Sequence, residues 1–194
     1  MKKIIIVFYI IFFVVPQVTF AEADNTFWDC YQDILNSVVT VNTFTSIDGD
    51  FSHASVDYEK IKSEPALQKK IMLQLKKLKI VKTPEGETYK LAFWINAYNF
   101  FTIVDVVNNY PVAGMKKIGW KSRHHEVEGV LYSLDNIEHN VIRPLADPRI
   151  HFAINCASVG CPSLKVEIFD GNRIDMQLNK VVVNALKNPL HLRM

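Results

Sequence analysis

Three kinds of hydrophobic pattern follow one another along the chain, and each predicts a different local structure. Residues 25–39 carry apolar side chains near helical spacing, which predicts a helix capped by Asp24. Residues 41–58 show no sustained period and are predicted to be a loop with extended pieces. A second helix is predicted from Ser63 to Leu78, with Pro65 in its first turn, where the missing N–H of proline does least harm.

The next pattern is apolar on nearly every side of a helix. Residues 91–107 read L-A-F-W-I-N-A-Y-N-F-F-T-I-V-D-V-V, and Pro111 ends the run. A helix that is hydrophobic all round belongs in the middle of a domain. Asn96 and Asn99 are three residues apart and share one face. Buried amides need hydrogen-bond partners, so these two either tie the helix to neighbouring backbone or orient a catalytic group or substrate carbonyl.

A short hairpin and another helix are predicted beyond this run. Residues 125–132 alternate around a Glu128-Gly129 turn, and Ser133 caps a helix that continues to Ile142. Glu138 falls within the apolar arc of this helix, so its carboxylate needs a partner. His139 and Arg143 lie on the flank, four residues apart. Either Glu138 forms a structural ion pair with an arginine, or Glu138 and His139 border a site.

The segment from Arg149 to Pro162, R-I-H-F-A-I-N-C-A-S-V-G-C-P, holds the most chemistry. Its alternating apolar residues predict a strand that delivers Cys156 into a turn of small residues, and Cys161 follows five positions later. A thiol held rigidly at the end of a strand is suited to be a nucleophile, but the same spacing also suits a small disulfide loop. One more amphipathic helix is predicted over residues 175–186.

Together these elements predict an α+β fold. We expect a single domain in which the buried central helix packs against a small, mostly antiparallel sheet.

The N-terminus has the three parts of a secretory signal peptide. Lys2 and Lys3 precede an unbroken apolar run over residues 4–15, which Pro16 ends, and small residues follow at Ala21 and Ala23. We therefore expect a signal peptide over residues 1–21 and a domain over residues 22–194, with Ala23 as the alternative cleavage site. The run is short for a membrane span, so an uncleaved anchor is the lesser alternative. The expected location is the periplasm or the extracellular space.

Charge and ligand spacing exclude several functions. Without Lys2 and Lys3 the chain has 20 basic and 20 acidic residues, so nothing indicates nucleic acid or an anionic membrane surface. Two cysteines and scattered histidines lack a recognisable ligand spacing, so we expect no metal site, and no feature indicates a cofactor.

Three motifs resemble a bacterial and plant family, the domain of unknown function numbered five-four-seven. They are W-I-N-A-Y-N at 94–99, D-N-I-E-H-N-V-I-R-P at 135–144 and H-F-A-I-N-C-A-S-V-G-C-P at 151–162. The resemblance covers residues 89–186 and implies an architecture comparable to papain-like and transglutaminase-like thiol enzymes. Members commonly continue past the last helix with an aromatic-rich segment, so this chain, which stops at Met194, is expected to be truncated there. The positions that match the family are Asn96, Asn99, Glu138, His139, Arg143, Cys156 and Cys161.

Two main functions follow, and the sequence leaves both open. The first is an envelope interaction or structural module, bound to a peptide or protein partner, in which Cys156 and Cys161 form a disulfide. The alternative is a thiol-dependent amide hydrolase or acyltransferase with Cys156 as nucleophile, His139 as base and Glu138 or Asn96 orienting the imidazole. In that case Asn99, Arg143 and Cys161 belong to the binding surface. His151 is a weaker candidate base, and a redox role for the cysteine pair is a third option.

Overall fold

The computed structural model describes residues 18–19, 25–47, 49–112, 118–158 and 160–189. Apart from Val18 and Thr19, the predicted signal peptide lies outside the described residues, as do Asp24 and the last five residues. Within the described part, no helix combines the length and apolarity needed to cross a membrane.

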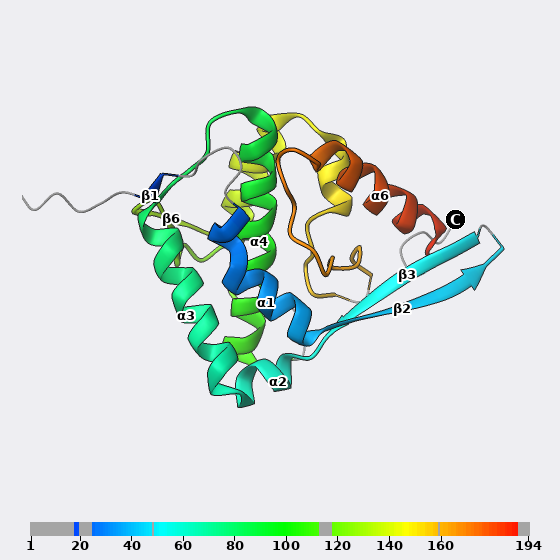
Figure 1. The fold of residues 1–194 in the computed structure, drawn as a ribbon, viewed down its shortest axis with the longest axis horizontal. Helices are drawn as coiled ribbons and strands as arrows, with labels where there is room; N and C mark the ends of the chain where they lie inside the picture. Colours follow the sequence, from blue (N-terminus) through cyan, green and yellow to red (C-terminus); the bar gives the residue numbers. More distant parts are fainter. Residues whose placement is uncertain (1–17, 20–24, 48, 113–117, 159, 190–194) are drawn as a thin grey trace, which may run out of the picture.

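The chain forms one α+β domain, as expected from the sequence, and α4 is its buried centre (Figure 1). Every residue of α4 from Leu91 to Val107 is buried. Around it pack α2, α5, α6 and the turn η3, so the expectation of a fully enclosed helix is confirmed. The helical elements are η1 (Asn25–Trp28), α1 (Asp29–Val38), α2 (Tyr58–Ser63), α3 (Pro65–Ile80), α4 (Glu87–Asn109), α5 (Leu134–Asn136), η3 (Ile137–Ile142), η4 (Arg143–Leu145), η5 (Pro148–Phe152) and α6 (Ile174–Lys187).

The strands lie in three separate two-stranded pairs. Two pairs are antiparallel hairpins and one is a short parallel contact. The hairpin predicted around Glu128-Gly129 is present, and both turn residues have positive φ, at 52° and 75°. The strands are β1 (Val18–Thr19) with β4 (Val81–Lys82), β2 (Val39–Ser46) with β3 (Gly49–Val56), and β5 (His125–Val127) with β6 (Val130–Tyr132).

The helix predicted from Ser63 to Leu78 is present as α3, but it begins at Pro65, and a separate short helix, α2, ends at Ser63. Asp57 caps α2, because its carboxylate accepts a hydrogen bond from the Lys60 N–H at 2.8 Å. Glu64 then adopts an extended conformation, as expected of a residue before proline, and Pro65 opens α3. Ser63 is therefore the last residue of α2, and the predicted cap at that position is wrong.

The segment predicted as a loop, residues 41–58, contributes most of a long hairpin. Strands β2 and β3 pair over eight residues each, from Val39 opposite Val56 to Ser46 opposite Gly49. The hairpin projects from the helical body on the side where α6 lies (Figure 1). Strand β2 is mostly exposed, whereas most residues of β3 are half-buried and Phe51 is buried.

Candidate functional site

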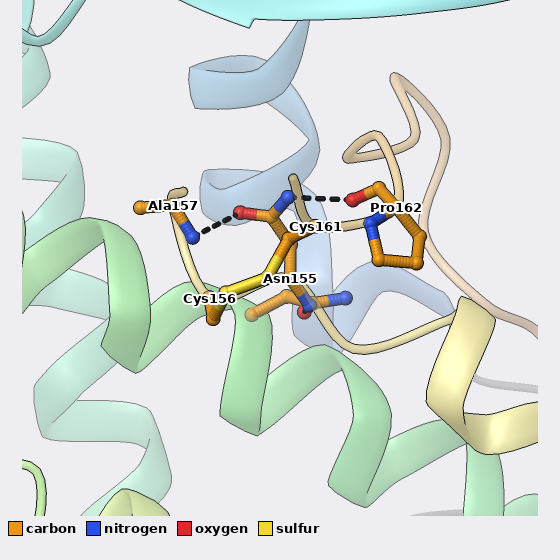
Figure 2. The surroundings of a disulfide bond; sticks show 6 residues. Asn155, Cys156, Ala157, Cys161 and Pro162 are labelled. Carbon is orange, nitrogen blue, oxygen red and sulfur yellow. Dashed lines mark hydrogen bonds between the residues drawn. A yellow bond between two sulfur atoms is a disulfide. The ribbon is translucent and has the colours of Figure 1, made fainter. Parts of the chain in front are cut away.

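The two cysteines of the C-A-S-V-G-C motif are joined in a disulfide (Figure 2). The Cα atoms of Cys156 and Cys161 are 6.0 Å apart. The predicted strand that delivers Cys156 is wrong, because residues 148–152 form the 3₁₀ turn η5. Proline opens this turn, and Asp147 caps it by accepting a hydrogen bond from the Arg149 N–H at 3.0 Å, which favours helical over extended backbone.

Two asparagines fix the cysteine turn to the rest of the molecule. Asn99 of α4 accepts a hydrogen bond from the Asn155 N–H at 2.8 Å and donates one to the Ala153 carbonyl at 2.9 Å. Asn155 in turn accepts from the Ala157 N–H at 2.8 Å and donates to the Pro162 carbonyl at 2.7 Å, as Figure 2 shows. The disulfide and the Asn155 side chain therefore bridge the same short loop side by side.

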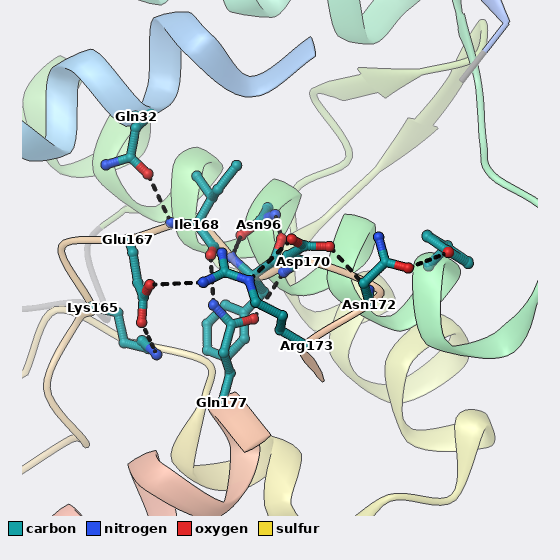
Figure 3. Close-up of polar contacts among 11 residues, drawn as sticks. Gln32, Asn96, Lys165, Glu167, Ile168, Asp170, Asn172, Arg173 and Gln177 are labelled. Atoms are coloured by element: carbon teal, nitrogen blue, oxygen red, sulfur yellow. Dashed lines mark hydrogen bonds and ion pairs between the residues drawn. The ribbon is translucent and has the colours of Figure 1, made fainter. Parts of the chain in front are cut away.

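The segment after the disulfide is held in the same way by side-chain amides from three helices (Figure 3). Asn96 of α4 bonds both the N–H and the carbonyl of Phe169, each at 2.8 Å. Gln32 of α1 accepts from the Ile168 N–H, and Gln177 of α6 accepts from the Asp170 N–H and donates to the Ile168 carbonyl. Both Asn96 and Asn99 thus tie α4 to neighbouring backbone, which is one of the two roles anticipated for them.

The structure does not bring His139 to the cysteines. The His139 Nδ1 atom lies 3.0 Å from the Asp135 carbonyl oxygen, one turn earlier in its own segment, and the ring is half-exposed. Among the described residues, no imidazole hydrogen-bonds to either sulfur of Cys156 or Cys161. In this disulfide-bonded form neither sulfur is a nucleophile, because nucleophilic attack requires a free thiolate.

Glu138 pairs with Arg143 through an unusual turn. Residues Ile137–Ile142 form the π-helical turn η3, in which residues five apart come together. The Glu138 Oε1 atom is therefore 2.7 Å from a terminal nitrogen of Arg143. Burial, followed by the charge of Glu138 and a hydrogen bond to it, raises the pKa of Tyr98 above its ordinary value. Tyr98, on α4, was missed because its contact with Glu138 depends on packing between two elements.

A groove of about 770 Å³ lies next to the segment that follows the disulfide. The hairpin, α6, α1 and the segment 162–167 form its walls. Its apolar lining includes Val41, Ala54, Leu164 and Val183. Lys165 on the floor pairs with Glu167 at 2.8 Å; burial lowers the pKa of Lys165, and the hydrogen bond to Glu167 partly opposes that change.

The hairpin itself has one closed edge and one open edge. On β3, the N–H and carbonyl of Ser52 both bond to the Asn184 side chain of α6, at 2.6 and 2.9 Å, and the Ala54 N–H bonds to Ser163. Because antiparallel residues alternate, their partners Thr43 and Val41 on β2 direct their backbone groups away from β3. Within the described residues these outward groups of β2 have no hydrogen-bond partner.

One further cluster has the donor types of a metal site. Asp105, His124 and His125 place three ligand atoms within 4.8 Å of one another, the one such group that includes histidine or cysteine among the described residues. The adjacent histidines were a signal in the sequence, but their convergence on a carboxylate 19 residues earlier is a consequence of the fold.

No curated protein matches the chain significantly, and neither does any solved structure. A family described as "Protein of unknown function, DUF547" matches residues 83–184, more than half of the chain. The match includes α4, the Glu138–Arg143 turn, the cysteine loop and most of α6. The chain therefore belongs to the DUF547 family.

Proposed function

We propose that this protein is an exported interaction module that binds an extended segment of another polypeptide along strand β2. The observation that carries the proposal is the open edge of β2 beside the groove. A polypeptide in extended conformation offers alternating N–H and carbonyl groups, which can pair with the outward carbonyl and N–H groups of this edge.

The composition of β2 supports the same proposal. Its sequence, V-T-V-N-T-F-T-S, contains no charged residue, and Val41 and Phe44 are 44 % and 48 % exposed. Natural proteins usually protect an edge strand with charges, proline or a covering element. An uncharged, β-branched edge left open is typical of a surface that a partner strand covers.

The groove gives the added strand a place for its side chains. Val41 belongs both to β2 and to the groove wall, so side chains on that face of an added strand lie toward the groove. Apolar side chains at alternate positions therefore match the apolar lining, and the Lys165–Glu167 pair adds polar groups at the floor.

In this proposal the Cys156–Cys161 disulfide is structural. It fixes the loop that leads into Pro162 and Ser163, and the Ser163 hydroxyl accepts the hydrogen bond from the Ala54 N–H. A disulfide is typical of proteins outside the reducing cytoplasm, which agrees with the predicted signal peptide.

The test uses a displayed library of short linear peptides, selected on the oxidised mature protein. Amide hydrogen exchange with a selected peptide should show protection at Val41, Thr43 and Thr45. Thr43→Pro removes an outward N–H without breaking the ladder to β3, and should weaken binding about tenfold. Thr43→Val keeps the N–H and serves as the matched control. Selection of no peptide, or equal binding by both variants, contradicts the proposal.

The alternative, a thiol-dependent amide hydrolase or acyltransferase with Cys156 as nucleophile, requires the reduced pair. Mass-spectrometric mapping of alkylated cysteines across pH 5–9, with and without reductant, separates the two functions. Protection of both cysteines until reductant is added supports the structural disulfide. Rapid alkylation of Cys156 well below pH 8 without reductant supports an activated thiolate.

A further inference from the structure

Two histidines converge on one buried carboxylate at the end of α4. The His124 Nε2 atom is 2.8 Å from Asp105 Oδ1, and the His125 Nε2 atom is 3.0 Å from Asp105 Oδ2. Asp105 and His125 are buried, whereas the His124 side chain is 44 % exposed. The cluster is thus closed on one side and open to solvent on the other.

Both ring nitrogens of His124 face atoms that accept hydrogen bonds. Nδ1 is 2.9 Å from the Ser122 carbonyl oxygen, and Nε2 faces the carboxylate. A neutral imidazole has one N–H, so it satisfies only one of these contacts. The other nitrogen needs either a second proton or a cation between it and the carboxylate.

The second imidazole favours the cation. The rings of His124 and His125 have centroids 4.0 Å apart, and the Nε2 atoms of both face the same carboxylate. His125 is also stacked on Phe101, at 4.2 Å, in an apolar wall. One divalent ion bound to both Nε2 atoms and to Asp105 would balance the charge of the buried carboxylate and use all three converging ligand atoms, which lie within 4.8 Å of one another.

We propose that Asp105, His124 and His125 bind a divalent transition metal of the zinc class. Imidazole nitrogen and carboxylate oxygen are ligands that zinc accepts, at about 2.0–2.2 Å. The Ser122 carbonyl holds Nδ1 of His124, so that Nε2 is directed at the metal, as a second contact typically does for a ligating histidine. Three protein ligands leave one coordination position open on the exposed side of His124.

The site has a defined place in the fold. Asp105 lies on α4, His125 begins β5, and His124 directly precedes that strand, after the connection that follows Pro111. Bound metal therefore links the start of the β5–β6 hairpin to the central helix. This inference is independent of the proposed peptide surface, since no residue of the cluster lines the groove.

The test is calorimetric titration of the full mature chain with ZnCl₂, with thermal unfolding measured in parallel. The wild-type protein should bind one equivalent and unfold at a higher temperature when zinc is present. His124→Ala, at the exposed ligand, should weaken binding by at least about tenfold. His139→Ala is the matched control, because His139 also lies near an aspartate but outside the cluster.

Asp105→Asn provides a second variant of nearly the same shape, and Co²⁺ absorption in the visible range reports the coordination geometry. Absence of one-to-one binding by the wild-type protein overturns the proposal and leaves a charged hydrogen-bonded cluster. Equal affinity in His124→Ala and His139→Ala overturns it as well, because zinc would then bind elsewhere.

Discussion

Residues 153–170 and the β2–β3 hairpin satisfy their backbone in opposite ways. The first segment has almost no regular structure, yet amide side chains of Gln32, Asn96, Asn99 and Gln177 pair its backbone groups. The hairpin is fully regular, yet the outward groups of Val41 and Thr43 on β2 have no partner in the described part of the chain. Regular structure is therefore a poor guide to which backbone groups are paired, because buried amides hold an irregular segment whereas a regular strand keeps outward groups without a partner among the described residues.

The largest loss of stability is expected when the side-chain hydrogen bonds that hold residues 153–170 are removed. Asn99→Ala leaves the Ala153 carbonyl and the Asn155 N–H without their partner in the interior, and should lower the free energy of unfolding by about 3 kcal/mol. Urea unfolding of the oxidised protein measures this loss. Asn109→Ala, on the exposed end of the same helix, should change stability by less than about 0.5 kcal/mol. Similar losses in both variants would mean that the Asn99 hydrogen bonds do not hold the segment.

Removal of the disulfide should cause the next largest loss in the free energy of unfolding. Joint replacement of Cys156 and Cys161 by alanine frees a loop of only a few residues, so the chain-entropy model gives a loss of about 2 kcal/mol. Unfolding of the double variant against the wild-type protein measures it. Cys30→Ala is the control, since Cys30 is a free cysteine on α1. A double variant as stable as wild type would show that the asparagine contacts alone hold the turn.

A smaller, pH-dependent loss of stability is expected at Asp147, which caps the turn η5 before residues 153–170. Hydrogen bonds from Arg149 hold the pKa of Asp147 below its ordinary value, against the opposing effect of burial. Because the folded-state pKa is the lower one, this stabilisation is present above about pH 4 and is lost as the pH falls through the folded value. Asp147→Asn keeps a capping oxygen but removes the charge, and should cost about 1 kcal/mol at pH 7.

Urea unfolding at pH 7 and near pH 2 tests whether the stabilisation by Asp147 is lost on acidification. The difference between Asp147→Asn and wild type should shrink at the lower pH. Asp175→Asn removes another carboxylate from the same guanidinium, but one that is 79 % exposed, so its effect should be smaller. A difference that grows on acidification would contradict the assignment.

The smallest effect on stability is expected at the open edge. Thr43→Lys places a charge on β2 without touching the ladder or a buried contact, so the free energy of unfolding should change by less than about 0.5 kcal/mol. The same charge should reduce pairing with any extended peptide, because charged edges resist strand addition. Measuring both stability and peptide binding of this one variant shows whether the β2 edge serves binding without contributing to folding. A large loss of stability would mean that the β2 edge is already in use within the folded chain.

The sequence predicts features that depend on neighbouring residues and misses those that depend on contacts between distant segments. The buried α4 and the β5–β6 hairpin were predicted correctly, because an all-round apolar run and a Glu-Gly turn are local signals. The β2–β3 hairpin was missed, since β3 is polar and its pairing is visible only in the fold. The strand before Cys156 was wrong because the cap at Asp147 outweighs a two-residue apolar spacing.

The candidate site shows the same division. Glu138 was expected to need a partner, but Arg143 reaches it through a π-helical turn that no residue pattern announces. The two asparagines of α4 were singled out from the sequence, while their targets, Ala153, Asn155 and Phe169, were not. The Asp105–histidine cluster needs the end of α4 and the start of β5 to meet, which is a property of packing.

Asn184 determines which edge of the hairpin can accept another strand. Its amide occupies both backbone groups of Ser52, as another strand would, and so ends the sheet on the β3 side. Strands can be added only beyond β2. Two copies joined through β2 would form a four-stranded sheet whose outer strands are both β3, each already terminated by its own Asn184. Such an assembly closes at two subunits, and the geometry that leaves one edge open also prevents it from extending into a fibre.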